Sequence, residues 1–188
     1  MQPPPRSFTT SSNSAGRLNV LKNRCSVSEA FDPNSGGTAP PLHEFDAIWD
    51  TGATNSCIAQ AVIDACGLVP TGMAQVHGVH GALPVETYLV NIRLPNTFIV
   101  WGVRVTRGDL FGGDILIGMD IISQGDFAVT NFGGITKFSF RMPSQAHIDF
   151  VEEFNRTQAQ AARLQHGGVH VANRPKRPKQ QKRRGKKK

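Results

Sequence analysis

Short hydrophobic runs, separated by turn-forming residues, follow one another across the middle of the chain. Gly, Pro, Asn and Asp interrupt these runs throughout residues 43–143, which is the pattern of β-strands joined by turns. The expected strands are residues 45–49, two strands within 73–94, and residues 98–105, 115–118, 127–132 and 135–140. The continuous apolar run over 115–117 predicts a strand buried on both faces, followed by a short helical turn. Residues 43–143 are therefore expected to form a mostly β domain.

A short helix is expected directly after residue 54. Asn55 or Ser56 can cap its start, and Gly67 can end it. Its apolar face would consist of Ile58, Ala61, Val62 and Ala65, which recur with the spacing of a helix.

A second helix is expected to run from Ser144 to about Gln165, in a C-terminal segment bounded at residues 144–166. Its apolar stripe is narrow and includes Ile148, Val151 and Phe154. Residues 167–188 follow, and they are expected to be a disordered tail.

Residues 1–42 contain few residues that a core could bury. Residues 1–15 are rich in Pro, Ser, Thr and Asn and are expected to be disordered. The apolar patch Leu18–Leu21 could form an edge strand. The predicted organisation is therefore a mostly disordered segment 1–42, the domain 43–143, the helix 144–166 and the tail 167–188.

The charge of the chain belongs to its tail. The 188 residues carry a net charge of +7, but ten of the 21 Lys and Arg residues lie between Arg174 and Lys188, without an acid among them. The remainder has 11 basic and 14 acidic residues, so the domain itself is mildly acidic. The tail could contact the phosphates of RNA or DNA without reading their sequence, or it could act as a solubilising end.

The composition also bears on location. No apolar run reaches the roughly 20 residues of a membrane helix, and residues 1–6 lack the apolar centre of a signal peptide. Three cysteines, an odd number, do not indicate a disulfide framework. A cytoplasmic location without a membrane partner is the expectation.

One carboxylate has the setting of a catalytic group. The apolar strand Phe45–Trp49 leads directly to Asp50, and a small hydroxyl and a glycine follow. Such a strand would deliver the carboxylate to the rim of a site, and Gly52 would let the chain turn away. Alternatively, Asp50 only caps a turn. Asp-Thr-Gly by itself does not separate these interpretations, but Ala53-Thr54 follows it and the run Ile115–Gly118 comes about 65 residues later.

In this combination, residues 45–143 resemble the retropepsins, the retroviral-type aspartic proteases. They look especially like the bacterial retropepsin-like proteins, with their Asp-Thr-Gly-Ala-Thr and Ile-Gly-Met-Asp segments. The resemblance implies a closed barrel of the acid-protease type, with one short helix after the Asp-Thr-Gly loop and a C-terminal helix. It also implies an aspartic endopeptidase that acts on extended peptides, with Asp50 as the catalytic residue and no cofactor.

The resemblance assigns roles to the neighbouring residues. The active-site loop is Thr51, Gly52 and Ala53; the Thr51 hydroxyl would bond the partner chain's loop, and Gly52 would leave space for substrate. The supporting strand is Ile115, Leu116, Ile117 and Gly118, and it would pack beneath this loop. The hairpin with Val76, His77, Gly78, Val79, His80 and Gly81 takes the place of the flap, which closes over substrate and excludes water.

The number of carboxylates implies a dimer. Enzymes of this family use two carboxylates that share a proton, whereas this chain has a single Asp-Thr-Gly. One Asp50 cannot be acid and base at once, so an enzyme of this kind must be a homodimer whose two Asp50 residues face each other across a two-fold axis. The alternative is a non-catalytic dimerisation module of the same fold whose basic tail binds nucleic acid or a partner.

Two features differ from the viral enzymes. Thr54, Asn55 and Met119 stand where those enzymes commonly have acidic residues and an arginine, so the dimer must be stabilised without that ion pair. His77 and His80 could sense pH or contact substrate, or they could be solvated surface. They lack a third ligand, so no metal site is expected.

Overall fold

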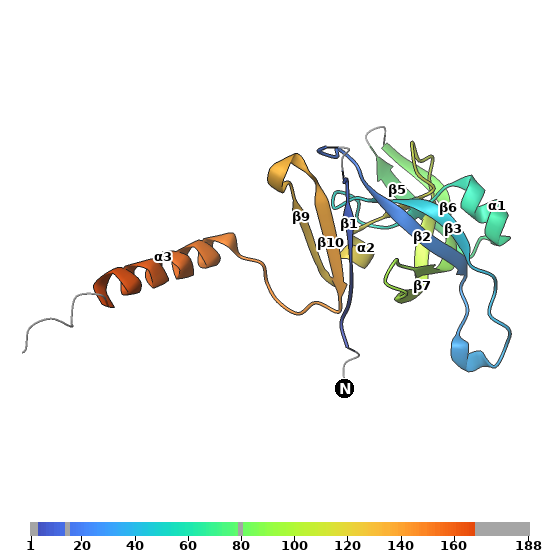
Figure 1. Ribbon diagram of the computed structural model, residues 1–188. Coiled ribbons are helices and arrows are strands. Elements are labelled where there is room, and N and C mark those ends of the chain that lie inside the picture. Colours follow the sequence, from blue (N-terminus) through green and yellow to red (C-terminus); the bar gives the residue numbers. More distant parts are fainter. Residues whose placement is uncertain (1–3, 14–15, 79–80, 168–188) are drawn as a thin grey trace, which may run out of the picture. The chain divides into compact units, whose positions relative to one another are not determined.

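The computed structural model describes residues 4–13, 16–78 and 81–167 (Figure 1). The chain divides into two compact units, Met1–Ala146 and His147–Lys188. The first unit holds all the strands and is described first.

Six strands of the first unit form a closed ring of backbone pairs. In their order around the ring they are β2 (Leu21–Glu29), β3 (His43–Trp49), β8 (Ile115–Ile117), β4 (Cys57–Ile58), β7 (Ile99–Arg107) and β6 (Gly81–Arg93). Pairing of β6 with β2, from Ser26↔Arg93 to Glu29↔Val90, closes the ring. The predicted mostly β closed barrel is confirmed. One further strand, β5 (Gly72–Gly78), pairs with β6 alone among the described strands and forms a hairpin with it.

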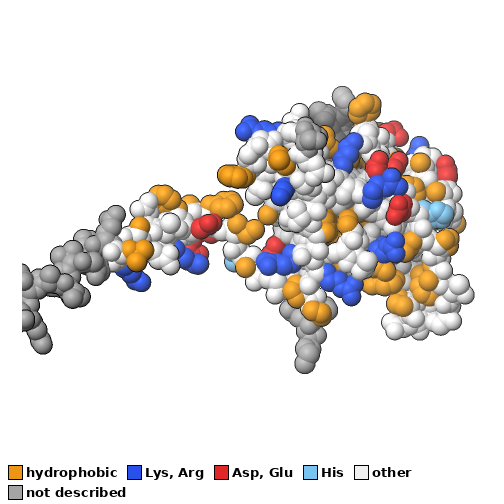
Figure 2. All heavy atoms as spheres, viewed as in Figure 1, with side chains coloured by type: hydrophobic (Ala, Val, Ile, Leu, Met, Phe, Trp, Pro, Cys, Tyr) orange, Lys and Arg blue, Asp and Glu red, His pale blue; other side chains and the backbone are white. Residues whose placement is uncertain are grey.

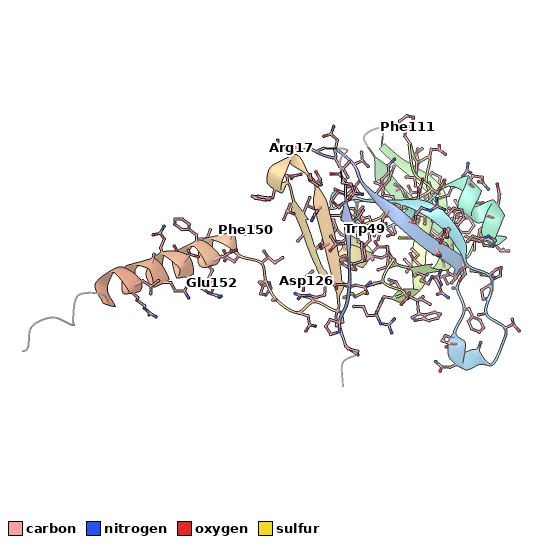
Figure 3. All side chains as sticks on the ribbon, viewed as in Figure 1. Arg17, Trp49, Phe111, Asp126, Phe150 and Glu152 are labelled. Carbon is pink, nitrogen blue, oxygen red and sulfur yellow. The ribbon has the colours of Figure 1, made fainter. Side chains whose placement is uncertain are left out.

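A second, three-stranded sheet packs on the barrel through aromatic side chains. It consists of β1 (Arg6–Ser11), β10 (Lys137–Met142) and β9 (Asp126–Thr130), all antiparallel. Trp49, the last residue of β3, stacks on Phe127 with ring centroids 5.5 Å apart, and it lies between the barrel and this sheet (Figure 3). The other rings of the cluster are Phe8, Phe138 and Phe140. This packing anchors the end of β3 from which Asp50 follows.

The N-terminal boundary predicted from the sequence was wrong. Arg6–Ser11 form β1, although residues 1–15 were expected to be disordered, and β2 belongs to the barrel, although the domain was expected to begin at residue 43. The run Arg6–Ser11 has only one large apolar residue, Phe8. Its order comes from backbone pairing with β10 and from the packing of Phe8 on Trp49, which local composition does not reveal.

The first helix, α1 (Gln60–Cys66), begins later than predicted. Ile58 was assigned to its apolar face but lies in β4, where it pairs with Ile115 and Arg107. Val62 and Ile63 are the buried residues of α1, while Ala61 and Ala65 are exposed. Gly67 ends the helix in a left-handed conformation, as predicted. Residues Cys57–Ile58, which the helical periodicity placed in the first turn, form strand β4 instead because they pair with β7 and β8.

Two further helices and two short 3₁₀ turns complete the described structure. The turns are η1 (Pro33–Ser35) and η2 (Phe132–Gly134), and α2 (Met119–Ile122) is the short helical turn predicted after β8. In the second unit, α3 (Phe150–Gly167) begins six residues after the predicted cap Ser144. Asp149 caps it instead, because its carboxylate accepts the backbone N–H groups of Val151 and Glu152. Figure 2 shows hydrophobic side chains on the surface of this helix.

Ser144 hydrogen-bonds to Asp126 and does not cap a helix. The Asp126 carboxylate accepts hydrogen bonds from the Ser144 hydroxyl, the Gln145 backbone N–H and the Arg141 guanidinium. The Ser144 hydrogen bond, together with the contacts from Gln145 and Arg141, outweighs the effect of burial and lowers the pKa of Asp126 from 3.8 to about 2. This carboxylate therefore stabilises the first unit only while it is ionised.

Acid should remove that stabilisation within a defined range of pH. Because the folded pKa lies below the unfolded one, the contribution of Asp126 is fully present above about pH 4 and is lost as the pH falls toward 2. We expect the difference in unfolding free energy between the wild type and Asp126→Asn to shrink over this range, measured by urea titration at several pH values. A difference that stays constant from pH 6 to pH 2 would contradict this assignment.

Candidate active site

Asp50 follows β3 at the point where the chain leaves the barrel. Its backbone N–H donates to the Ile117 carbonyl at 3.0 Å, continuing the parallel pairing of Trp49 with Ile117. The Gly52 N–H donates to Asp50 Oδ1 at 2.8 Å, and the Ala53 N–H donates to the Asp50 carbonyl at 3.3 Å. The carboxylate is half-buried and is held by the turn that the sequence predicted. Thr51 and Gly52 are exposed beside it.

The predicted supporting strand lies directly against this loop. Gly118 follows β8, and a Cβ at this position would come within 2.6 Å of the Asn55 carbonyl carbon and 3.0 Å of the Ala53 oxygen. Two backbone hydrogen bonds join the segments: the Met119 N–H donates to the Ala53 carbonyl at 2.8 Å, and the Asp120 N–H donates to the Thr54 carbonyl at 3.1 Å. The structure thus brings together two of the three predicted groups of site residues, the loop from Asp50 to Ala53 and the strand from Ile115 to Gly118.

Ser56 and Asp120 also hold the loop, although the sequence analysis did not select them. Ser56 is fully buried, and its hydroxyl donates to Asp120 Oδ1 at 2.8 Å while accepting the Gly118 N–H at 3.0 Å. The Ser56 N–H donates to Asp120 Oδ2 at 3.0 Å. Buried polar groups of this kind must be hydrogen-bonded, so this pair fixes the loop relative to α2. The sequence held one signal for this pair, because Asp120 is the last residue of the Ile-Gly-Met-Asp segment. Its partner Ser56, however, was interpreted as a possible helix cap.

The predicted flap is the β5–β6 hairpin. Val76 pairs with Leu83, and Gly78 pairs with Gly81, while Val79 and His80 lie outside the described residues. At the base of the hairpin a cavity of about 490 Å³ opens between the flap strands and the segment Arg107–Asp109. Its apolar lining is Met73, Val76, Leu83, Pro84 and Val85, and its charged lining is Glu86, Arg107 and Asp109.

Cys57 lies next to this cavity. Its thiol is adjacent to Gly108, which lines the cavity. Burial, followed by the negative charges of Asp120 and Asp50, raises the pKa of Cys57 to about 11. The thiol therefore stays protonated near neutral pH, whereas a nucleophilic cysteine needs a thiolate.

Among residues 4–13, 16–78 and 81–167, no group of three or more His, Cys, Asp or Glu side chains is placed to hold a metal ion. No helix in the described part of the chain is long and apolar enough to span a membrane. The basic stretch Arg174 to Lys188, for which a nucleic-acid contact was one of two alternatives, lies outside the described residues.

Solved structures of retropepsin-like aspartic proteases, the class that the sequence resembles, match the chain. A retropepsin-like aspartic protease from Rickettsia conorii matches with a TM-score of 0.44 and 9% identity, over 75% of this chain and 98% of that chain.

Two viral proteases match as well. The protease of simian foamy virus has a TM-score of 0.38 and 16% identity, over 55% of this chain and 92% of its own. EIAV protease bound to an inhibitor has a TM-score of 0.39 and 17% identity, over 56% of this chain and 86% of its own. No protein-family model matches the sequence, and no curated protein sequence does.

Proposed function

We propose that the protein is an aspartic endopeptidase that acts as a homodimer. The observation that carries this proposal is the carboxylate of Asp50, which the Gly52 N–H orients at the end of a strand locked to β8. A carboxylate with a fixed orientation suits general acid–base catalysis, because proton transfer needs the group in a defined position relative to the reacting atoms. The chain has one such Asp-Thr-Gly loop, so a second copy would supply the other carboxylate.

In the proposed mechanism the two Asp50 side chains share one proton. Two adjacent carboxylates do not both ionise at low cost, so their pKa values separate and belong to the pair. The ionised Asp50 takes a proton from a water molecule, which attacks the peptide carbonyl carbon. The protonated Asp50 donates its proton to the carbonyl oxygen. These transfers give a tetrahedral gem-diol. It collapses when the C–N bond breaks: the nitrogen takes the proton that the first Asp50 accepted from water, and one diol hydroxyl returns a proton to the second Asp50. The two subunits thus have different roles in one turnover.

The substrate in this proposal is an extended peptide. It would lie between the flap and the loop Asp50 to Ala53, paired with backbone groups as an added strand. The flap strands supply apolar contacts through Met73, Val76 and Leu83. The exposed Thr51 is available to bond the loop of the other subunit, and Gly52 leaves the approach to the carboxylate open.

A peptide-library cleavage assay tests this function. The purified full chain is incubated with a mixed peptide library at several values between about pH 4 and pH 7, and cleavage products are identified by mass spectrometry. We expect cleavage within extended apolar segments by the wild type and none by Asp50→Asn, with both chains showing the same circular dichroism spectrum.

The same assay decides against the proposal if no peptide is cleaved at any pH. That outcome would favour a non-catalytic dimerisation module. In such a module the basic stretch Arg174 to Lys188 would bind nucleic acid. A chain that ends at residue 173 should then lose a salt-sensitive interaction with nucleic acid. Cleavage that persists in Asp50→Asn would instead assign the activity to another residue or to a contaminant.

A further inference from the structure

The cavity beneath the flap contains charged groups as well as apolar ones. Glu86, Arg107 and Asp109 line it together with the apolar flap residues. Two acids and one base leave this lining with a net negative charge. A purely apolar side chain would bury part of this charged surface without satisfying it, which costs free energy. The cavity is therefore better suited to a ligand that has an apolar stem and a positively charged end.

Glu86 is the acidic group whose position is fixed. The Tyr88 hydroxyl donates to Glu86 Oε2 at 2.7 Å, and Tyr88 is only 2% exposed. Burial, followed by this hydrogen bond and the charge of Glu86, raises the pKa of Tyr88 to about 12, so the phenol remains a donor. This is the one hydrogen bond that the described residues make to the Glu86 carboxylate, and it leaves Oε1 available to a ligand.

Arg107 lies across from Glu86 without forming a close ion pair with it. Thr87 pairs with Thr106 across β6 and β7, so the next positions along the two strands are Glu86 and Arg107. Despite this register, the ion pairs within 4.0 Å among the described residues do not include these two. Glu86 is thus an oriented carboxylate without a close cationic partner in this part of the chain.

We infer that this cavity binds a lysine or arginine side chain of the peptide substrate, and that Glu86 determines this specificity. The inference rests on the proposed function. The aliphatic stem lies along Met73, the cross-strand neighbour of Glu86, as long basic side chains commonly do on apolar surfaces, and the cationic end reaches Glu86 Oε1. Because a two-fold dimer has two such cavities, basic residues are preferred at matched positions on both sides of the cleaved bond.

Positional peptide sets test this specificity. Labelled peptides carry Lys, Met or Glu at each position around the cleaved bond; Met matches the length and apolar stem of Lys without its charge. At the position that occupies the cavity, we expect kcat/KM for the Lys peptide to exceed that for the Met peptide by roughly tenfold, with the Glu peptide poorest. In Glu86→Gln this Lys-to-Met ratio should fall to about one.

The matched control is Glu44→Gln, which removes an exposed carboxylate paired with Arg24 outside the cavity. Its Lys-to-Met ratio should equal that of the wild type. A wild type that does not discriminate Lys from Met at any position, or a Glu86→Gln variant that keeps the preference, would overturn the inference while leaving peptide cleavage intact.

A binding measurement separates this inference from the proposed function. Fluorescence anisotropy with the same labelled peptides is performed on Asp50→Asn and on the double variant Asp50→Asn/Glu86→Gln, neither of which needs to cleave. Tighter binding of Lys than Met peptides by the first variant only supports the role of Glu86, whether or not the wild type cleaves. Equal binding of both peptides by the first variant contradicts that role.

Discussion

Mixing equal amounts of wild-type and Asp50→Asn chains should reduce peptide cleavage to about one quarter of that of the same total amount of wild type. Random pairing in a two-fold dimer gives one quarter wild-type dimers, one half mixed dimers and one quarter variant dimers. A mixed dimer has one carboxylate and one amide, and the amide neither activates the water nor donates a carboxyl proton. In Asp50→Asn alone, loss of both the acid and the base should lower kcat by at least roughly 10⁴-fold.

The measurement is cleavage of one library-derived peptide as a function of the fraction of variant chains, after the mixture has been dissociated and allowed to re-associate. The expected activity follows the square of the wild-type fraction. A chain with a complete site of its own would give a straight line. The control is Asp46→Asn, because Asp46 is exposed on the barrel and pairs with Arg24 rather than with the loop; mixtures with this variant should retain the activity of the wild type.

Gly118→Ala should destabilise the first unit and displace the loop that carries Asp50. A Cβ at this position would lie 2.6 Å and 2.8 Å from the Asn55 carbonyl carbon and oxygen, and 3.0 Å from the Ala53 oxygen. These are backbone atoms, which cannot rotate away as a side chain can. The φ of Gly118 is −95°, which any residue can adopt, so the cost is steric. We expect a loss of about 3 kcal/mol in unfolding free energy, at the upper end for an overpacked site.

The peptide-cleavage rate of this variant should also fall. Gly118 and the loop Ala53 to Asn55 can accommodate the methyl group only by moving apart, and that moves Asp50 relative to the Asp50 of the other subunit in the proposed dimer. A displacement of about 1 Å at a catalytic group can reduce the rate by roughly 10²-fold. The measurements are urea unfolding and peptide cleavage at a temperature where the variant is folded.

Gly37→Ala is the matched control for Gly118→Ala. Its Cβ would meet two side-chain atoms, of Phe31 at 3.3 Å and of Ser35 at 3.8 Å, and no backbone atom within 4 Å, so the unfolding free energy should change by less than about 1 kcal/mol. If Gly118→Ala is as stable and active as Gly37→Ala, the close approach of the two segments does not hold the site.

Much of the candidate site could be predicted because its residues have strong local signals. An apolar strand before Asp50 and a glycine after it indicate a carboxylate at a turn, and the structure has that turn. Gly118 was placed in a strand that packs beneath the loop, and the short distances to Asn55 and Ala53 agree with that placement. The flap strands were recognisable from the glycines at Gly78 and Gly81, which pair with each other.

The parts that could not be predicted depend on partners far away in the sequence. Ser56 has the composition of a helix cap, and only its contact with Asp120, 64 residues later, makes it a buried support of the loop. Ser144 likewise has the composition of a cap, but its hydroxyl binds Asp126. In both cases a local rule assigned the side chain to the nearest backbone, and a distant carboxylate was the stronger partner.

The sequence by itself determined that this chain forms a mostly β domain with one carboxylate at the end of a buried strand, because strand periodicity and turn residues act over a few positions. The tertiary structure alone decided that β6 and β2 close the barrel, that β1 is ordered, and that Ser56 and Asp120 support the loop. It also decided that Glu86 lies in the cavity under the flap with Tyr88 holding it. These features arise from contacts whose free energy exists only once distant strands have come together.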